Sequence, residues 1–435
     1  MVEGGDKVLV NGESRIETRN TDIDASAVTP DASISPSITT NIPVPASPTI
    51  FTTKNKEKLT IFNVLRLTFI IIFFIIGCLS IVFTQFLINT SLFWSPIYKR
   101  ILLNFTKTNF VILLTFVTAV CSPATLLITH DESIPKNSFQ YRKNLLKSYL
   151  CDNSIIISNH QIYIDWLFLW FLAYMNDVAN NVYIIMKKSL KNIPVLGYGM
   201  KNYKFIFLSR KWELDKILML NQLANIDHYS RILEKNYYFN SLKKNWLILF
   251  PEGTNLSTDR KKKSDDWCKK IDQKLLKNCL LPRVKGLYLS TLQLSSTTKK
   301  IYDITIGYGG ISKDQFAQDI YTLKKTYLYG LGPREVHLHF RCFDIDKDIP
   351  NVKFDKNLIN DEKNMEKFEQ WLFKTWYEKD DYLNSFYKNG NFKMENTSET
   401  YKIELKIGSY TELIRIFIIP FVFLVLCYWI KSFFY

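Results

Sequence analysis

Residues 155–165 read IIISNHQIYID, and this stretch decides the expected fold. Three consecutive isoleucines are typical of a strand that is buried on both faces. The polar residues that follow end the strand, and the aromatic-rich run at 166–171 predicts a helix after the loop. We therefore expect a buried strand, a loop that carries His160, and a helix that begins near Asp165.

The spacing of His160 and Asp165 predicts how the two side chains meet. Neighbours on a helix face are three or four positions apart, so residues five apart do not share a face. His160 is then expected in the loop, with Asp165 reaching back from the first helical turn. A carboxylate placed in this way fixes the imidazole tautomer and stabilises the imidazolium that forms when histidine accepts a proton. Taken alone the motif is weak, because a histidine at a strand end is more often a structural hydrogen-bonding group.

The composition indicates a membrane-associated protein with anionic partners. The 435 residues are 15% aromatic and carry a net charge of +15. Nucleic acid, an anionic membrane surface or a phosphate-bearing substrate would each explain the charge. The sequence has neither an arginine-rich arm nor a recognised nucleic-acid motif, so we expect a lipid bilayer and phosphates, and no nucleic acid. The seven cysteines form no CxxC pair, so we expect neither a metal site nor a disulfide framework.

The N-terminal part divides into a polar tail and two apolar segments. Residues 1–58, rich in Ser, Thr and Pro, predict a disordered tail. Residues 59–136 predict a membrane helix pair. Its first arm, at 67–88, is uncharged and apolar on all faces. Its second arm, at 110–129, is interrupted by Ser122-Pro123, so it either spans the bilayer or lies with the first arm in one leaflet.

Two crossings by this pair would leave the basic flanks on both sides of it in the cytosol. The sequons at 89–91 and 104–106 fall between the two arms, so a glycan there would mark a luminal loop.

The rest of the chain predicts an α/β domain and a third apolar helix. Residues 405–435 contain the run 416–430, which predicts a C-terminal membrane-associated helix, either spanning or interfacial. In residues 137–404, short β-branched runs alternate with helical stretches, which is typical of helices flanking a mixed sheet. The expected strands are 155–157, 182–185, 205–208, 246–250, 302–308 and 336–340, and the expected helices include 213–235 and 363–377.

Two further strands end in residues suited to a phosphate or a polyol. The strand at 205–208 leads to Arg210, whose guanidinium suits bidentate recognition of oxygen. The strand at 246–250 breaks at Pro251 and places Glu252 at the turn, where its carboxylate suits the hydroxyls of a polyol acceptor. Backbone amides at such a turn also suit an anion or a developing oxyanion.

Basic residues recur between these motifs and the C-terminal half. Arg283 and Lys285 lie beside a Pro/Gly-shaped turn and are suited to phosphate. The run Arg260–Lys263 predicts a solvated loop, or less commonly a docking point for headgroups or nucleotide phosphates.

The ordered set resembles the glycerolipid acyltransferase family, the 1-acylglycerol-3-phosphate acyltransferase-like enzymes. The motifs that carry the resemblance are Asn159-His160 with Asp165, then Phe207-Leu208-Ser209-Arg210, then Phe250-Pro251-Glu252-Gly253-Thr254. The resemblance covers about residues 67–392. The stretches 205–212, 282–286, 302–308 and 379–383 resemble the lysocardiolipin and lysophosphatidylinositol acyltransferase branch more closely.

Three departures from the wider family agree with that branch. Lys204 stands where the arginine motif often begins with Gly, Asn255 stands where many members carry Arg, and Asp303-Ile304-Thr305 replaces a proline-containing motif.

The resemblance implies transfer of an acyl chain from acyl-CoA to a lysophospholipid hydroxyl, with no cofactor. His160 would be the base and Asp165 would orient it. The implied substrate-binding residues are Asn159, Arg210, Glu252, Gly253, Thr254, Arg283 and Lys285. The implied location is the endoplasmic reticulum membrane, with the catalytic domain in the cytosol. A lysophosphatidic acid acyltransferase and a non-catalytic lipid-binding membrane protein are the alternatives.

Overall fold

The computed structural model describes residues 60–142, 145–235, 244–312, 314–350, 356–392 and 399–434. The predicted disordered tail at 1–58 lies outside the described residues. The helices are α1 (Ile61–Ser91), α2 (Pro96–Cys121), α3 (Asp165–Met175), α4 (Leu196–Asn202), α5 (Trp212–Lys235), α6 (Thr258–Lys270), α7 (Val284–Leu294), α8 (Ala317–Ile320), α9 (Glu362–Asn389) and α10 (Thr411–Phe434). Short helical turns are η1 (Ala179–Asn181), η2 (Lys188–Asn192), η4 (Lys324–Tyr329) and η5 (Lys356–Asn360).

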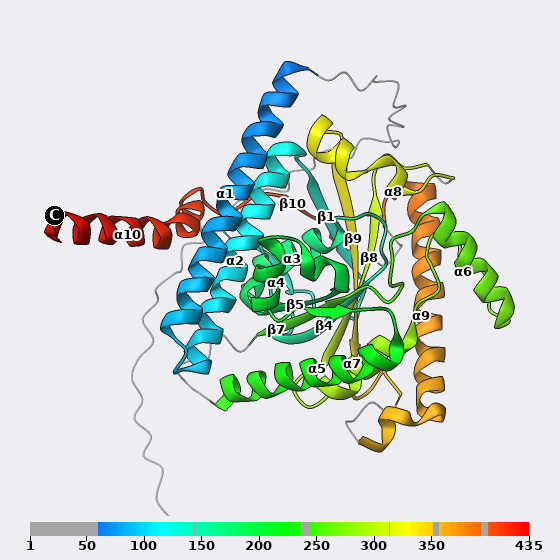
Figure 1. Ribbon diagram of the computed structural model, residues 1–435. Helices are drawn as coiled ribbons and strands as arrows, with labels where there is room; N and C mark the ends of the chain where they lie inside the picture. Colours follow the sequence, from blue (N-terminus) through cyan, green and yellow to red (C-terminus); the bar gives the residue numbers. More distant parts are fainter. Residues whose placement is uncertain are drawn as a thin grey trace, which may run out of the picture. The chain divides into compact units, whose positions relative to one another are not determined.

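An eight-stranded mixed sheet forms the centre of the α/β body (Figure 1), as predicted. Its order is β10-β1-β9-β8-β4-β7-β5-β6. The neighbours β8, β4, β7, β5 and β6 pair in parallel, whereas β9 is antiparallel to β8, and β10 is antiparallel to β1. The strands are β1 (Thr125–His130), β4 (Asn153–Ser158), β5 (Val182–Lys187), β6 (Ile206–Leu208), β7 (Asn245–Leu249), β8 (Lys300–Tyr308), β9 (Glu335–Asp344) and β10 (Tyr401–Glu404). A separate hairpin joins β2 (Phe139–Arg142) to β3 (Leu145–Ser148).

The isoleucine run lies in β4, where both faces of the sheet are covered. Ile156 packs in the core on the α3 side, and Ile155 and Ile157 pack in the core on the α5, α7 and α9 side. Successive side chains of a strand point to opposite faces, so an uninterrupted apolar run requires apolar cover on both. This double cover fixes β4 at the middle of the sheet and places His160 just beyond its carboxyl end.

A buried charge network ties β8 and β9 to α9. Asp303 is fully buried, and its carboxylate lies 2.6 Å from Lys379 Nζ and accepts a 2.7 Å hydrogen bond from Arg341 Nη2. Arg341 also donates to Glu378 on the outer side. Because buried charges require partners, this cluster fixes α9 against the centre of the sheet.

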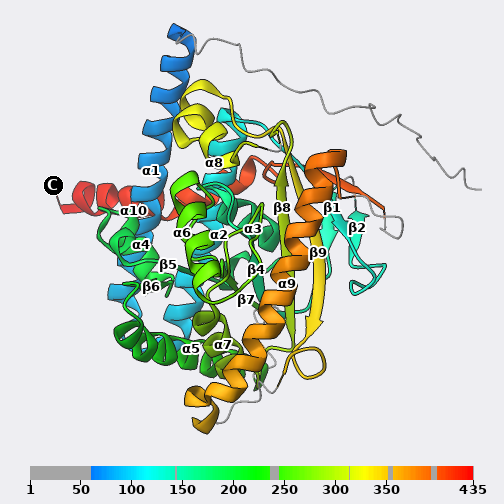
Figure 2. The same cartoon turned by 90° about the vertical axis from the view of Figure 1, so that its right-hand side faces the viewer.

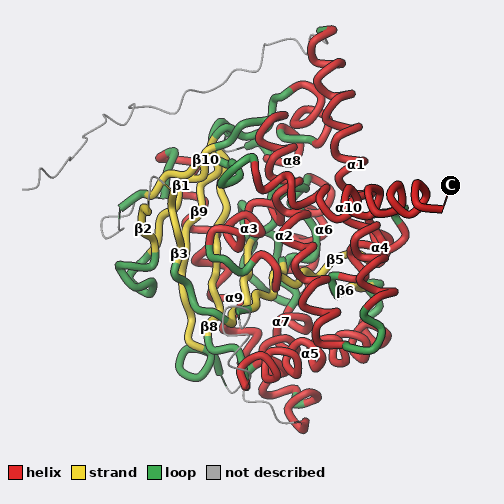
Figure 3. The backbone as a smooth tube through the Cα atoms, turned by 90° about the vertical axis from the view of Figure 1, so that its left-hand side faces the viewer, coloured by secondary structure: helices red, strands yellow, loops and turns green. Residues whose placement is uncertain are grey.

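The three apolar segments form helices, and one prediction about them was wrong. The described chain has three helices long and apolar enough to cross a membrane: α1, α2 and α10. The predicted second arm at 110–129 is not one helix, because α2 ends at Cys121 and residues from Thr125 enter the sheet as β1. Ser122-Pro123 separates the two elements. Figure 3 shows α1 and α10 on the side away from the β10–β1 edge.

Two other boundaries are notable. The basic run Arg260–Lys263 lies in helix α6 rather than in the predicted loop. The division of the chain at residue 137 stays a prediction, although the sheet takes β1 from before that residue.

We expect Asp303→Asn to lower the free energy of unfolding by about 3–5 kcal/mol, because it leaves Lys379 and Arg341 buried without their shared counter-ion. Glu378→Gln is the matched control. Glu378 pairs with the same arginine but is 41% exposed, and exposed pairs contribute at most about 1 kcal/mol. Chemical unfolding of the detergent-solubilised protein measures both, and equal losses would contradict the role assigned to the buried network.

Candidate active site

His160 and Asp165 are in contact as their spacing predicts. His160 Nδ1 lies 2.7 Å from Asp165 Oδ2. The same oxygen accepts from the backbone amides of Gln161 at 2.6 Å and Ile162 at 2.9 Å, so the loop folds around the carboxylate. An ionised carboxylate only accepts hydrogen bonds, so Nδ1 carries the proton and Nε2 carries the free lone pair. The imidazole is 18% exposed and Asp165 is fully buried, which is the arrangement that a histidine base requires.

Tyr308, the last residue of β8, donates a hydrogen bond to Asp165 Oδ1. Tyr308 is fully buried, and burial together with the neighbouring Asp165 raises the pKa of its phenol well above the ordinary value. The phenol therefore stays protonated and remains a donor. Both oxygens of Asp165 are thus engaged, one by the histidine loop and one by the sheet.

The loop after β7 packs directly on the histidine. The ring of Phe250 stacks on the His160 imidazole, with centroids 4.4 Å apart and planes 25° apart. Leu256 N donates to His160 O at 2.7 Å. The motif that begins at Phe250 is therefore in contact with the motif of His160 and Asp165.

The two polar neighbours of His160 are held by other loops. Asn159 is buried, and its amide donates to Ile306 O at 2.9 Å and accepts from Ile306 N at 2.8 Å. Gln161 donates to Asn278 O at 2.9 Å, and the amide of Asn278 in turn donates to Asp380 on α9. A substrate contact by Asn159 stays a prediction, because its amide is engaged by β8 here.

The Glu252 side chain is buried between the loop after β7 and helix α9, and it is not exposed to solvent. It is 2% exposed, and the indole of Trp376 donates to its Oε1 at 3.3 Å. Burial raises the pKa of Glu252 well above the ordinary value, although Trp376, the peptide groups of His160 and Leu280, and Lys379 act against this. Its predicted contact with acceptor hydroxyls stays a prediction, since the side chain faces α9.

Gly253 brings two arginines together at the turn. The glycine has φ +72°, a conformation that other residues rarely adopt. Arg210 Nη2 donates to Gly253 O at 3.2 Å, and a Cβ on Gly253 would lie 3.3 Å from the Arg283 side chain. The amide of Gly253 donates to Phe250 O at 2.9 Å, so it is engaged within the turn and does not face an oxyanion.

Arg260 supplies a third guanidinium near Arg210 and Arg283. Burial and the nearby Arg210 and Arg260 lower the pKa of Arg283. Within the described ranges, none of these three arginines forms an ion pair with a carboxylate. Lys285 Nζ lies 5.6 Å from the ring centroid of Trp212, two positions after Arg210, and Thr254 is half-buried beside Gly253. The structure therefore gathers the predicted basic residues next to the histidine loop, where an anionic group would be attracted.

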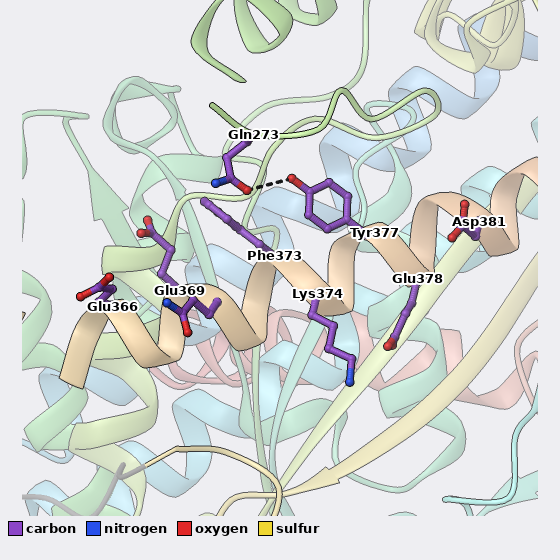
Figure 4. Close-up of a pocket in the computed structure, with 9 residues that line it drawn as sticks. Gln273, Glu366, Glu369, Phe373, Lys374, Tyr377, Glu378 and Asp381 are labelled. Atoms are coloured by element: carbon purple, nitrogen blue, oxygen red, sulfur yellow. Dashed lines mark hydrogen bonds between the residues drawn. The ribbon is translucent and has the colours of Figure 1, made fainter. Parts of the chain in front are cut away.

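A cavity of about 430 Å³ on the outer face of α9 has the opposite character. Figure 4 shows its carboxylates Glu366, Glu369, Glu378 and Asp381 along the helix, with Gln273 hydrogen-bonded to Tyr377. Its lining includes neither residue of the histidine–aspartate pair. An acidic hollow repels phosphates, so we do not assign it to the substrate.

Comparison with known proteins shows the family of the chain. A family model described as "Acyltransferase" matches residues 129–309, and one described as "Acyltransferase C-terminus" matches residues 326–407. A 2-acyl-1-lysophosphatidylinositol acyltransferase of Saccharomyces cerevisiae is 39% identical over 375 residues, which cover 80% of this chain and 91% of that protein. This chain belongs to the glycerolipid acyltransferase family. The acyltransferase is thus an enzyme of the family that its three motifs predict.

Other relatives fall in the predicted branch and in the wider family. Lysocardiolipin acyltransferase 1 of Gallus gallus is 31% identical over 55% of each chain. A probable 1-acyl-sn-glycerol-3-phosphate acyltransferase 5 of Arabidopsis thaliana is 30% identical over 58% of each chain.

Sequence reasoning missed Tyr308 and the stacking of Phe250. Both residues were inside stretches used for the family resemblance, but neither had an assigned role. Tyr308 is 143 positions from Asp165 in the chain, so no spacing rule connects them. Its place on β8 in phase with Ile304 and Ile306 was the available signal that it faces the α3 side.

We expect Tyr308→Phe to lower kcat about tenfold while KM for either substrate stays unchanged. Hydrogen bonds to charged groups contribute roughly 1.5–3 kcal/mol, and Tyr308→Phe removes one from Asp165. The ion pair between Asp165 and His160 matters most once His160 has gained a proton. Tyr302→Phe on the same strand is the control, because the Tyr302 hydroxyl accepts from Cys151 N at 2.8 Å and does not contact the pair. Steady-state kinetics in membranes distinguish the two variants. Similar losses in both would indicate a general effect on packing instead.

Proposed function

We propose that the acyltransferase moves a fatty acyl chain from acyl-CoA to the hydroxyl of lysophosphatidylinositol or a related anionic lysophospholipid. The observation that carries this proposal is the buried Asp165 holding His160 next to the group Arg210, Arg260 and Arg283. The named activity of the yeast relative, which the chain matches over most of its length, supports the choice of acceptor.

In the proposed reaction, His160 Nε2 removes the proton from the acceptor hydroxyl as its oxygen attacks the thioester carbonyl. The carbon–sulfur bond then breaks, and the imidazolium returns the proton to the departing thiolate of CoA. The products are the phospholipid ester and free CoA. Asp165 stabilises the imidazolium between these two steps, and no covalent enzyme intermediate is required because the thioester is already activated.

The arginine group has the charge and the position to bind the acceptor phosphate. Arg210 and Arg283 lie against Gly253 in the turn that follows Phe250, and Phe250 contacts His160. A lysophospholipid bound there would carry its hydroxyl close to the base. We also propose that Glu252 and Asn159 position the loops after β7 and β4 rather than contacting substrate.

We further propose that the enzyme resides in the endoplasmic reticulum with its body in the cytosol.

An acceptor panel tests the proposed function. Membranes that contain the protein receive labelled oleoyl-CoA with lysophosphatidylinositol, lysocardiolipin, lysophosphatidic acid or lysophosphatidylcholine. We expect lysophosphatidylinositol to react fastest, and His160→Ala and Asp165→Asn to lose about 10²–10⁴-fold in kcat. His228→Ala is the control, because His228 is exposed on α5.

Each result decides a different part of the proposal. Exclusive use of lysophosphatidic acid would keep the chemistry and overturn the acceptor. Normal turnover by His160→Ala at equal expression would overturn the base. Inactivity of the folded protein on all four acceptors would favour a lipid-binding role.

We expect Arg283→Ala to raise KM for the anionic lysophospholipid about tenfold or more, with a smaller change in kcat. The reason is the loss of a charge-assisted hydrogen bond to phosphate, which contributes roughly 1.5–3 kcal/mol. Arg142→Ala, at an exposed position on β2, is the matched control. Acceptor titrations at fixed acyl-CoA measure the change. An unaltered KM would place the phosphate elsewhere.

A further inference from the structure

Helix α1 contacts the α/β body near both of its ends. Close to its start, Arg66 Nη2 donates to Leu328 O in η4 at 3.4 Å. Close to its end, the amide of Asn89 donates to Asn202 Oδ1 at 3.3 Å and to the hydroxyl of Tyr198, both in α4. At 1.5 Å per residue, Arg66 and Asn89 are about 34 Å apart, which exceeds the roughly 30 Å of a hydrocarbon core. If α1 crossed a bilayer, the body would have to fill its whole thickness.

Helix α2 lies against the body in the same way. Near its start, Arg100 donates to Asn225 O at 3.3 Å. In its middle, Lys107 is fully buried and donates to Val182 O of β5 at 3.1 Å. Near its end, the hydroxyls of Thr118 and Tyr327 are 3.0 Å apart. Two thirds of the most apolar window of α2, 67%, is buried against protein.

The outer face of α1 is a continuous apolar stripe. Its members recur at helical spacing and are about half exposed or more: Leu65, Phe69, Ile72, Ile76, Leu79 and Phe86. The opposite face carries the buried polar residues Ser80, Thr84 and Gln85. A long helix with one face on protein and one apolar face outward is suited to lie in the plane of a leaflet.

Helix α10 has a different environment. Its contacts with α1 include the 2.5 Å hydrogen bond from Ser80 to Ile416 O and the packing of Phe83 on Phe423, with centroids 5.2 Å apart. Beyond Phe423 its side chains are exposed on every side, and only 6% of its most apolar window is buried. Its 24 residues extend about 36 Å, enough to span a bilayer. Figures 1 and 2 both show it running crosswise to α1.

We propose that α10 is the one described helix that crosses the bilayer, and that α1 lies along the near leaflet with α2 between it and the body. Two helices that run crosswise cannot both follow the membrane normal, and α10 has the least covered apolar window of the three candidates, 6% buried against 33% for α1 and 67% for α2. Lys431, in the last turn of α10, then lies on the opposite side of the membrane from His160. The connection between α1 and α2 stays on the side of the body.

This arrangement changes the meaning of the two sequons. Asn104 is 3% exposed and donates to Asn181 Oδ1 at 2.6 Å, so it is closed to a glycosyltransferase on either side. Asn89 is engaged by α4. In the proposed arrangement the connection between the two arms is a turn on the body's side, which corresponds to the single-leaflet alternative for this pair.

Glycosylation mapping of the full chain in sealed endoplasmic reticulum microsomes tests the proposal. One variant carries a flexible C-terminal tag with a sequon. In the other, Phe93→Asn together with Pro96→Ala creates a sequon with Ser95, without a proline after it, at a site that is 78% exposed between α1 and α2. We expect a complete, glycosidase-sensitive mass shift for the tag and none for Phe93→Asn. The tag with Gln in place of its Asn is the matched control, and acyl transfer by each variant shows that it is folded.

Two results would overturn the proposal. A glycan at Phe93→Asn would place the α1–α2 connection in the lumen, so that the pair crosses the membrane. An unmodified tag that added protease removes from sealed microsomes would show that α10 does not cross. Protection of the tag until detergent opens the vesicles, together with the unmodified turn, supports the proposed arrangement.

Discussion

The buried carboxylate of Asp165 is the interaction on which the site depends. It has no contact with solvent, so its charge is tolerated only because donors surround it. These donors come from the His160 loop and from Tyr308 at the end of β8, while the carboxylate itself begins α3. A helix N-terminus also favours an acidic group. One side chain thereby fixes the loop, the helix and the strand relative to one another.

Strand β8 connects this carboxylate to the rest of the body. Its residues alternate, so Tyr308 faces α3 while Asp303 faces α9 and pairs with Lys379. The next residue of α9, Asp380, accepts from the amides of Lys277 and Asn278, and Asn278 holds Gln161 beside the histidine. The pair is therefore braced from the sheet side and from α9, which is consistent with a base that must keep one orientation.

Short sequence patterns correctly predicted the features that depend on neighbouring residues in the chain. The isoleucine run before His160 fixed a central strand, and the five-residue spacing to Asp165 gave the loop-to-helix contact. Tyr308 is joined to Asp165 by strand order, which no local pattern encodes. The burial of Glu252 likewise depends on where α9 packs. The helix predicted at 110–129 was also too long at its carboxyl end, because it was predicted from apolarity alone. A buried strand such as β1 is as apolar as a membrane helix.

In the proposed membrane arrangement, the spanning helix α10 is connected to the catalytic pair through helix α3. At the start of α10, Glu412 accepts a 2.7 Å hydrogen bond from the Tyr174 hydroxyl, which itself accepts from Gly408 N at 2.9 Å. Tyr174 is on α3, the helix that begins with Asp165. Two turns and a half of rigid helix thus separate the anchor of the spanning segment from the carboxylate that orients His160. Both acyl chains of the proposed substrates reside in or near the bilayer, so the base must stay at one depth. A rigid connection from α10 through α3 meets that requirement without any contact between the membrane helix and the substrate.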